Sequence, residues 1–428
     1  MKSKTINVRE IMLPAIAAFI LLTPTIKPGR LPGIRLEQVV LVLVTLYLVY
    51  SLVKGRDQLV HKSIFPVGLL FFSVFVLVSI LNGYLNGYDI IFNDFFELYK
   101  IYIYVGIFTL TASLALDDET KFRVLKFMHL YFIITAVVAV TQYFDPFGIN
   151  ELYLPILAPT HSITLINDYP SPRVVGLSDN PNVYSFMMAV ATNLSYMLYL
   201  KFRNNKYIVG MVLNFIVLLM TKSRTGFVFF IIAFVILTAL MLRGRMERKK
   251  VRIVKRIAIF IGIIMISLVV FTLALFILPD DLTWRVKQMA DFTKQTSWVN
   301  RINNWQENIS YIKEHPILGI GPGKAVEFKY SPDNEWIFLL RRYGVLGTTY
   351  LIAIFAVSIK KRWGHLSNTY PGRLYISLII GSVFFMITAG LYHSFQLMAM
   401  MMMIAGLAYG RKEDLMSVKE ILKIRGNP

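Results

Sequence analysis

The chain has 428 residues, of which 56% are hydrophobic and only 16% are charged, a composition that excludes an ordinary soluble protein. The absence of cysteine excludes disulfide frameworks, thiolate metal sites, iron–sulfur clusters and cysteine nucleophiles. The formal net charge of +20 is carried by short basic clusters between apolar runs, which is typical of membrane topology and not of nucleic-acid binding.

Apolar runs recur along the whole chain, and the mean hydropathy is +0.58. Measured against the ~20 residues that a helix needs to cross the hydrocarbon core, they predict a single all-α, polytopic transmembrane bundle of about twelve spans. The first run follows a basic start without a small-residue cleavage site, so we expect it to remain as a span. In chain order the predicted spans are 11–26, 36–53, 64–81, 98–116, 124–144, 182–200, 206–220, 225–242, 257–278, 338–359, 374–391 and 394–410.

The distribution of basic residues predicts the orientation of this bundle. An even number of spans places both termini on one side, and most of the 45 Lys and Arg residues, including the stretch from Arg243 to Arg256, fall on that side. Because Lys and Arg accumulate in cytoplasmic connections, we expect both termini in the cytoplasm. The remaining basic residues oppose this trend, so they either meet an anionic ligand or lie in a loop long enough to cross regardless of charge.

Two outward connections, 145–181 and 279–336, are much longer than the others, so we expect the chemistry on the outer face. Several prolines in the first predict an ordered, irregular segment and not a helix. Between the seventh and eighth spans, the hairpin Thr221-Lys222-Ser223-Arg224-Thr-Gly226 is so short that it holds Lys222 and Arg224 at the membrane surface. Its glycine and small hydroxyl residues favour close helix approach.

The second long connection contains a helical pattern over 297–314, in which apolar residues recur at spacings of three and four: Trp298, Ile302, Trp305, Ile309 and Ile312. Such a helix is expected at the outer membrane surface or against the bundle, with Arg301 flanking its apolar face. The following Gly319, Gly321 and Gly323 predict a flexible turn, because no Gly-Lys-Ser/Thr of a nucleotide loop accompanies them.

The tenth span begins just after Asp333 and Asn334 and carries Arg341 and Arg342 about two turns deeper. Two adjacent arginines inside an apolar run either face a polar cavity or extend to the outer interface. Asp333 and Asn334 are candidates for chemistry, and capping of the helix is the structural alternative for both.

Five motifs between about residues 170 and 350 together resemble the O-antigen ligase and polymerase family, polytopic membrane glycosyltransferases with a GT-C-like fold. They are Arg173-Val-Val-Gly…Asn180-Pro-Asn182, Ser223-Arg224-Thr-Gly, Arg301 with Trp305, His315-Pro-Ile-Leu-Gly-Ile-Gly-Pro-Gly, and Asp333-Asn334-Glu-Trp…Tyr343-Gly-Val-Leu-Gly347. The resemblance implies transfer of a glycan from an undecaprenyl diphosphate carrier to an acceptor hydroxyl, without nucleotide sugar, metal or other cofactor. It also implies a bacterial inner membrane, with the reaction on the periplasmic or extracellular face.

Ligases of this family place a His immediately before the Asn of the last motif, where this chain has Asp333. The departure favours a polymerase that joins lipid-linked repeat units into O-antigen or a related surface polysaccharide. A ligase that transfers the glycan to a lipid or another acceptor is the alternative. Expected partners are the donor, the acceptor and membrane lipid, with a flippase and a chain-length regulator as candidates and no nucleic acid.

Breaking the sugar–diphosphate bond develops negative charge, which fixed arginines stabilise. We therefore expect Arg224 and Arg301 to act in catalysis, and Asp333 to accept the proton of the acceptor hydroxyl. Predicted substrate-binding residues are Arg173, Asn180, Asn182, Lys222, Asn334, Arg341 and Arg342. The six His are scattered, without metal-ligand spacing. A transporter or flippase of lipid-linked glycan is a second alternative, although the two halves of the chain lack visible repetition.

Overall fold

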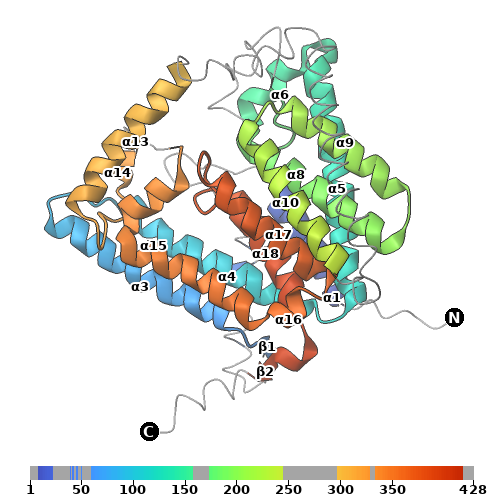
Figure 1. The fold of residues 1–428 in the computed structure, drawn as a ribbon, viewed down its shortest axis with the longest axis horizontal. Helices are drawn as coiled ribbons and strands as arrows, with labels where there is room; N and C mark the ends of the chain where they lie inside the picture. Colours follow the sequence, from blue (N-terminus) through green and yellow to red (C-terminus); the bar gives the residue numbers. More distant parts are fainter. Residues whose placement is uncertain are drawn as a thin grey trace.

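The computed structural model describes residues 8–22, 59–157, 173–243, 296–327 and 333–417, together with a few positions between 39 and 50 (Figure 1). Outside these residues lie the predicted span 257–278, most of 36–53, residues 158–172 of the connection 145–181, and residues 279–295 and 328–332 of the connection 279–336. The described part is helical apart from one small antiparallel sheet, in which β1 (Leu59–His61) pairs with β2 (Leu415–Ser417). The predicted all-α class is therefore confirmed.

Ten of the predicted spans coincide with helices of the described residues. They are α1 (Val8–Leu22), α3 (Ile64–Leu85), α4 (Phe96–Leu114), α5 (Asp118–Phe144), α8 (Pro181–Phe202), α9 (Lys206–Met220), α10 (Arg224–Arg243), α15 (Glu335–Lys361), α17 (Tyr370–Phe385) and α18 (Phe395–Tyr409). Among the described residues, 6 helices are long and apolar enough to cross a membrane, and shorter apolar helices accompany them. The chain is thus a polytopic integral membrane protein, and the total of about twelve spans remains a prediction.

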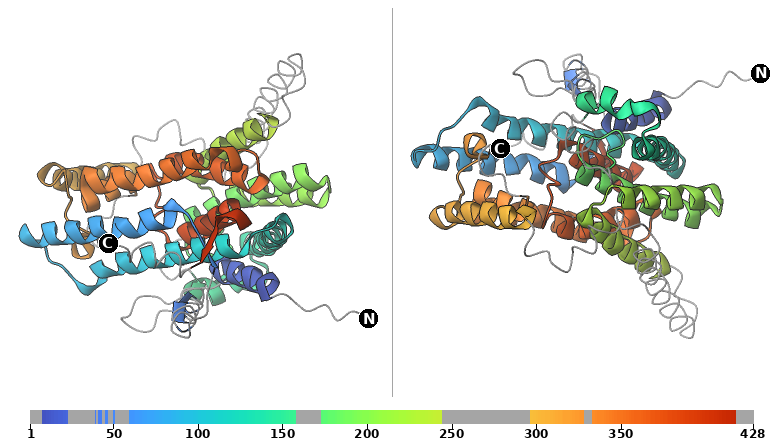
Figure 2. Two further views of the ribbon diagram at one scale, coloured as in Figure 1. Left: turned by 90° about the horizontal axis from the view of Figure 1, so that it is seen from below. Right: turned by 90° about the horizontal axis from the view of Figure 1, so that it is seen from above.

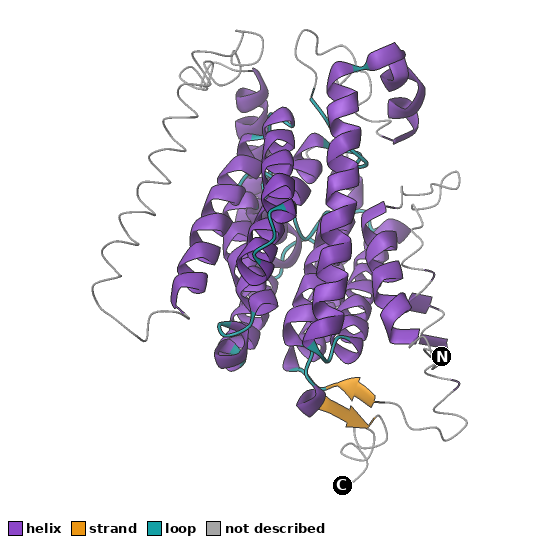
Figure 3. Ribbon diagram, turned by 90° about the vertical axis from the view of Figure 1, so that its right-hand side faces the viewer, coloured by secondary structure: helices purple, strands orange, loops and turns teal. Residues whose placement is uncertain are grey.

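The helices pack side by side in one bundle (Figures 2 and 3). Of the six long spans, α8 is the most enclosed, with 78% of its apolar window buried between α9, α10 and α5. α15 lies against α3, which in turn lies against α4. α18 packs on α4 and α17, and its run from Met398 to Met403 is entirely buried. Unbranched methionines fill irregular space between helices well, so packing alone explains this run.

Shorter elements connect the long helices: η1 (Phe92–Phe95), η2 (Pro146–Gly148), α6 (Ile149–Leu157), α13 (Thr296–Glu314), α14 (Lys324–Glu327), α16 (Trp363–Leu366) and η5 (Lys412–Asp414). α13 occupies the residues for which the tryptophan and isoleucine spacing predicts a helix. The expectation of an irregular segment after residue 145 is wrong for α6. The Asp145 carboxylate accepts the Asn150 N–H at 3.0 Å and starts this helix, and Pro155 lies near its end, where a missing N–H removes a single bond.

The glycine-rich segment after α13 is fixed in place, which corrects the prediction of a flexible turn. Ile320 and Gly321 donate backbone hydrogen bonds of 2.9 Å to the carbonyl oxygens of Arg341 and Arg342. α15 is kinked opposite the segment at Gly344, where φ is 60°. A Cβ at Gly344 would lie 2.2 Å from a carbonyl oxygen of the segment, so only glycine permits this approach. The glycines therefore serve close packing.

Candidate active site

The predicted site residues lie at one end of the bundle, opposite the small sheet. α8, α10 and α15 begin at this end, where α3, α9 and α17 finish. Two contacts tie these helix ends together: the hydroxyls of Thr225 and Thr388 are 2.5 Å apart, and the Glu335 N–H donates to the Met386 carbonyl at 2.9 Å. Figure 3 shows the sheet beyond the other end.

The first group of site residues, the hairpin group, joins two motifs that lie far apart in the sequence. The Arg173 guanidinium donates to the Thr221 carbonyl at 3.0 Å and to Asn182 Oδ1 at 3.2 Å. The Ser223 hydroxyl donates to the same Asn182 oxygen at 3.0 Å. Arg224 is the first residue of α10 and is exposed. Arg173 is thus held beside the hairpin that carries Lys222 and Arg224.

Local sequence explains why this group forms. The Asn180 side chain accepts the Asn182 N–H and caps α8, and Pro181 occupies the first helical position, where its missing N–H is not needed. Because Gly226 has no side chain, α10 can approach α8 closely. A Cβ at this position would lie 2.2 Å from the Ser185 hydroxyl. Asn180, predicted to bind substrate, therefore serves at least as a helix cap.

Sequence reasoning missed Gln142, which positions the segment carrying Arg173. Gln142 is buried on α5, and its Oε1 accepts the N–H groups of Val175 and Gly176 at 3.0 and 2.8 Å. Its Nε2 donates to the Gly176 carbonyl at 2.6 Å. The only sequence signal is that Gln142 is a lone amide near the end of an apolar span. A polar group buried in a membrane protein needs a hydrogen-bond partner, so such an amide points to a contact.

The second group is an ion pair between Arg301 of α13 and Asp333, which lies two residues before the start of α15. Arg301 Nε lies 2.9 Å from Asp333 Oδ2, and the two side chains are 31% and 58% exposed. Asn334 Oδ1 accepts the N–H groups of Trp336 and Ile337 at 2.9 and 3.1 Å, so Asn334 caps α15. Asp333 does not occupy the capping position and keeps its carboxylate at the surface.

The third group surrounds Arg341 and Arg342, both of which are fully buried. Arg341 donates to Asn308 Oδ1 on α13 at 2.6 Å, and Arg342 donates to Glu97 Oε1 on α4 at 3.0 Å. The Arg342 guanidinium also lies 3.6 Å from the centre of the Phe338 ring. Of the two alternatives left open by the sequence, extension to the interface is wrong: both arginines enter a buried polar cluster.

Glu97 is the centre of this buried cluster. Its Oε1 lies 2.9 Å from Lys100, 3.0 Å from Arg342 and 3.7 Å from Lys324, so three cations share one carboxylate. The Lys100 and Lys324 side chains are 16% and 15% exposed, whereas Glu97 is fully buried. Lys100, three residues further along α4, is thus only one of three cations that neutralise Glu97. The sequence offered no signal for Lys324 or Asn308.

Glu335 is a further acidic residue that sequence reasoning did not single out. It is the first residue of α15, is 2% exposed, and its Oε2 lies 3.4 Å from the His393 N–H. Its Oε1 makes no hydrogen bond with any described residue. No group of three His, Asp or Glu side chains in the described part of the chain is arranged to hold a metal ion.

Comparison with known proteins bears on the same region. The family model described as O-antigen ligase matches residues 209–352, which include Arg224, Arg301, Asp333 and the two buried arginines. No curated protein matches the chain. The match over 209–352 covers less than half of the chain; within it, this chain is similar to the O-antigen ligase family, which confirms the resemblance of its motifs.

Proposed function

We propose that the protein is a polysaccharide polymerase that uses an undecaprenyl diphosphate-linked glycan as donor and a second lipid-linked repeat unit as acceptor. The observation that carries the proposal is that cations of α10, α13, α14 and α4 lie at the same bundle end, and that one of them, Arg301, pairs with the exposed carboxylate of Asp333. The family match over the same helices supports it. The charge distribution of the loops favours the outer face of the inner membrane for this end.

The donor's diphosphate is the expected ligand of the cations. As the sugar leaves, negative charge develops on the diphosphate oxygen, and preorganised guanidinium groups stabilise that charge. Arg224 is exposed and Arg301 is 31% exposed, so both are accessible to a membrane-bound head group. Lys100 and Lys324 share Glu97 with Arg342 and add positive charge nearby. No metal ion is required for this stabilisation.

Asp333 is the proposed base. The acceptor hydroxyl oxygen attacks the anomeric carbon, its proton passes to the Asp333 carboxylate, and the bond from that carbon to the diphosphate oxygen breaks, leaving the diphosphate on its carrier. Arg301 orients Asp333 through the 2.9 Å contact. A single displacement of this kind inverts the anomeric configuration.

A ligase is the second candidate, because O-antigen ligase is the description of the matching family. The aspartate at position 333, where ligases place a His, favours the polymerase. Reconstitution of the purified protein with the carrier-linked repeat as sole substrate separates the two. A ladder of longer lipid-linked glycans is expected. Product that forms only after a different acceptor is added would identify a ligase, and movement across the bilayer with unchanged glycan length would contradict both.

The role of Asp333 is tested in the same assay. We expect Asp333→Asn to reduce turnover by about 10²–10⁴-fold, because a general base is lost, with much less effect on donor binding. Asp118→Asn is the control, since Asp118 is exposed at the start of α5, at the other bundle end. Unchanged turnover in Asp333→Asn would exclude Asp333 as the base and leave it only a structural role in the ion pair with Arg301.

A further inference from the structure

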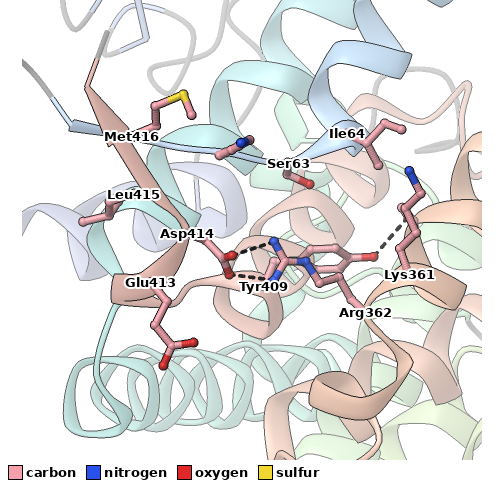
Figure 4. A pocket seen from close by; sticks show the side chains of 11 residues that line it. Ser63, Ile64, Lys361, Arg362, Tyr409, Glu413, Asp414, Leu415 and Met416 are labelled. Atoms are coloured by element: carbon pink, nitrogen blue, oxygen red, sulfur yellow. Dashed lines mark hydrogen bonds and ion pairs between the residues drawn. The ribbon is translucent and has the colours of Figure 1, made fainter. Parts of the chain in front are cut away.

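A second polar site lies at the bundle end remote from the candidate active site. A cavity of about 450 Å³ opens between the start of α3, the end of α15 and strand β2 (Figure 4). Lys62, Ser63 and Ile64 line it on one side, and Lys361 and Arg362 line it on another. None of these residues takes part in the proposed glycan transfer.

The charges around this cavity do not cancel. Arg362 is occupied by Asp414, with two hydrogen bonds of 2.9 and 2.7 Å, and Glu413 is bonded to Arg411. Lys62 and Lys361 are exposed and form no ion pair with any described residue. The cavity therefore presents two cations whose charge is not neutralised by its own acidic residues.

Apolar side chains are exposed on the two helices that flank the cavity. On α3, Ile64 is 43% exposed and Val67, one turn further along, is 61% exposed. On α15, Val357 is 40% exposed and lies one turn before Lys361. The two lysines thus adjoin an exposed apolar surface. This arrangement is complementary to a phospholipid, in which an anionic head group is followed by acyl chains.

We propose that this cavity binds the head group of an anionic phospholipid, with the phosphate between Lys62 and Lys361 and the acyl chains against the exposed faces of α3 and α15. The Ser63 hydroxyl already accepts the Phe65 N–H, so the start of α3 is capped internally and the two lysines supply the affinity. The positive-inside distribution assigns this site to the cytoplasmic leaflet. The inference does not depend on the proposed glycan transfer.

Native mass spectrometry of the full chain in detergent, titrated with phosphatidylglycerol or with phosphatidylcholine of the same acyl chains, tests the proposal. We expect retention of phosphatidylglycerol and weak retention of phosphatidylcholine. Lys62→Gln and Lys361→Gln should each weaken phosphatidylglycerol binding roughly fivefold, and the double variant by more than about tenfold. Lys360→Gln is the matched control, because Lys360 is exposed beside Lys361 but does not line the cavity.

Three outcomes would overturn the proposal. They are wild-type lipid binding in the double variant, an equal loss in Lys360→Gln, and displacement of the lipid by millimolar inorganic phosphate, which would indicate a site for the free anion. Thermal unfolding without added lipid checks that the variants are folded. If the double variant does not fold, the two single variants decide the question against Lys360→Gln.

Discussion

Two arginine–carboxylate pairs join α15, or the segment just before it, to other helices, and their environments are opposite. Arg301 and Asp333 are 2.9 Å apart with side chains 31% and 58% exposed. Arg342 and Glu97 are 3.0 Å apart and both fully buried. An exposed pair contributes little to stability and remains accessible to a ligand, whereas a buried pair leaves a costly unpaired charge when one partner is removed. Similar geometry therefore supports different roles in the two regions.

The largest expected effect on stability comes from the buried pair. Glu97→Ala leaves Arg342 without its carboxylate and should lower the free energy of unfolding by about 3–5 kcal/mol, seen as a large fall in the thermal midpoint of the purified protein. Glu119→Ala is the control, because Glu119 pairs with Arg123 but is 83% exposed, and we expect a change below about 1 kcal/mol. Similar midpoints for the two variants would remove the contrast between buried and exposed pairs.

The exposed cations should show the reverse pattern, with activity lost and stability kept. Arg224→Ala should reduce glycan elongation by about 10²–10³-fold, as expected when a group that stabilises the leaving oxyanion is removed, with an unchanged thermal midpoint. Arg243→Ala, at the exposed far end of the same helix, should elongate normally. Normal elongation by Arg224→Ala would remove Arg224 from the proposed mechanism.

Arg341, the buried neighbour of Arg342, offers an intermediate case. Asn308→Ala removes the acceptor of the 2.6 Å bond from Arg341 and should destabilise the protein by about 1–3 kcal/mol, because a buried charged donor loses a partner. Asn303→Ala, on the exposed side of the same helix, should have little effect on the thermal midpoint. If both variants unfold alike, the contact between α13 and α15 contributes nothing measurable.

The smallest effect concerns the stability contribution of Arg301 and Asp333. A double-mutant cycle with Arg301→Ala and Asp333→Ala, followed by thermal unfolding, should give a coupling energy below about 1 kcal/mol, since both groups are solvated. The same cycle on Glu97 and Arg342 should give a larger coupling. Strong coupling in the exposed pair would mean that Arg301 and Asp333 act mainly in packing α13 against the bundle.

Much of the molecule could be predicted from the sequence, because hydrophobic periodicity and capping are local. The apolar runs located the described membrane helices, and Asn180-Pro181 marked the start of α8. The motifs around Arg224, Arg301 and Asp333 indicated a resemblance that the family match over residues 209–352 supports. Local patterns gave a wrong prediction at α6. The prolines of this segment predicted irregular structure, but a helix forms because the Asp145 carboxylate accepts a backbone N–H at its start.

Tertiary structure alone decided which charged residues are buried together. Glu97 and Arg342 are separated by 245 positions in the sequence. Arg341 on α15 donates a hydrogen bond to Asn308 on α13. The sequence fixes the face of a helix on which a side chain lies, because 3.6 residues make a turn. It does not specify which helix packs on that face, since that choice depends on the summed packing of all neighbours. The membrane character and the resemblance to a family were therefore readable in advance, and the division between buried and accessible arginines was not.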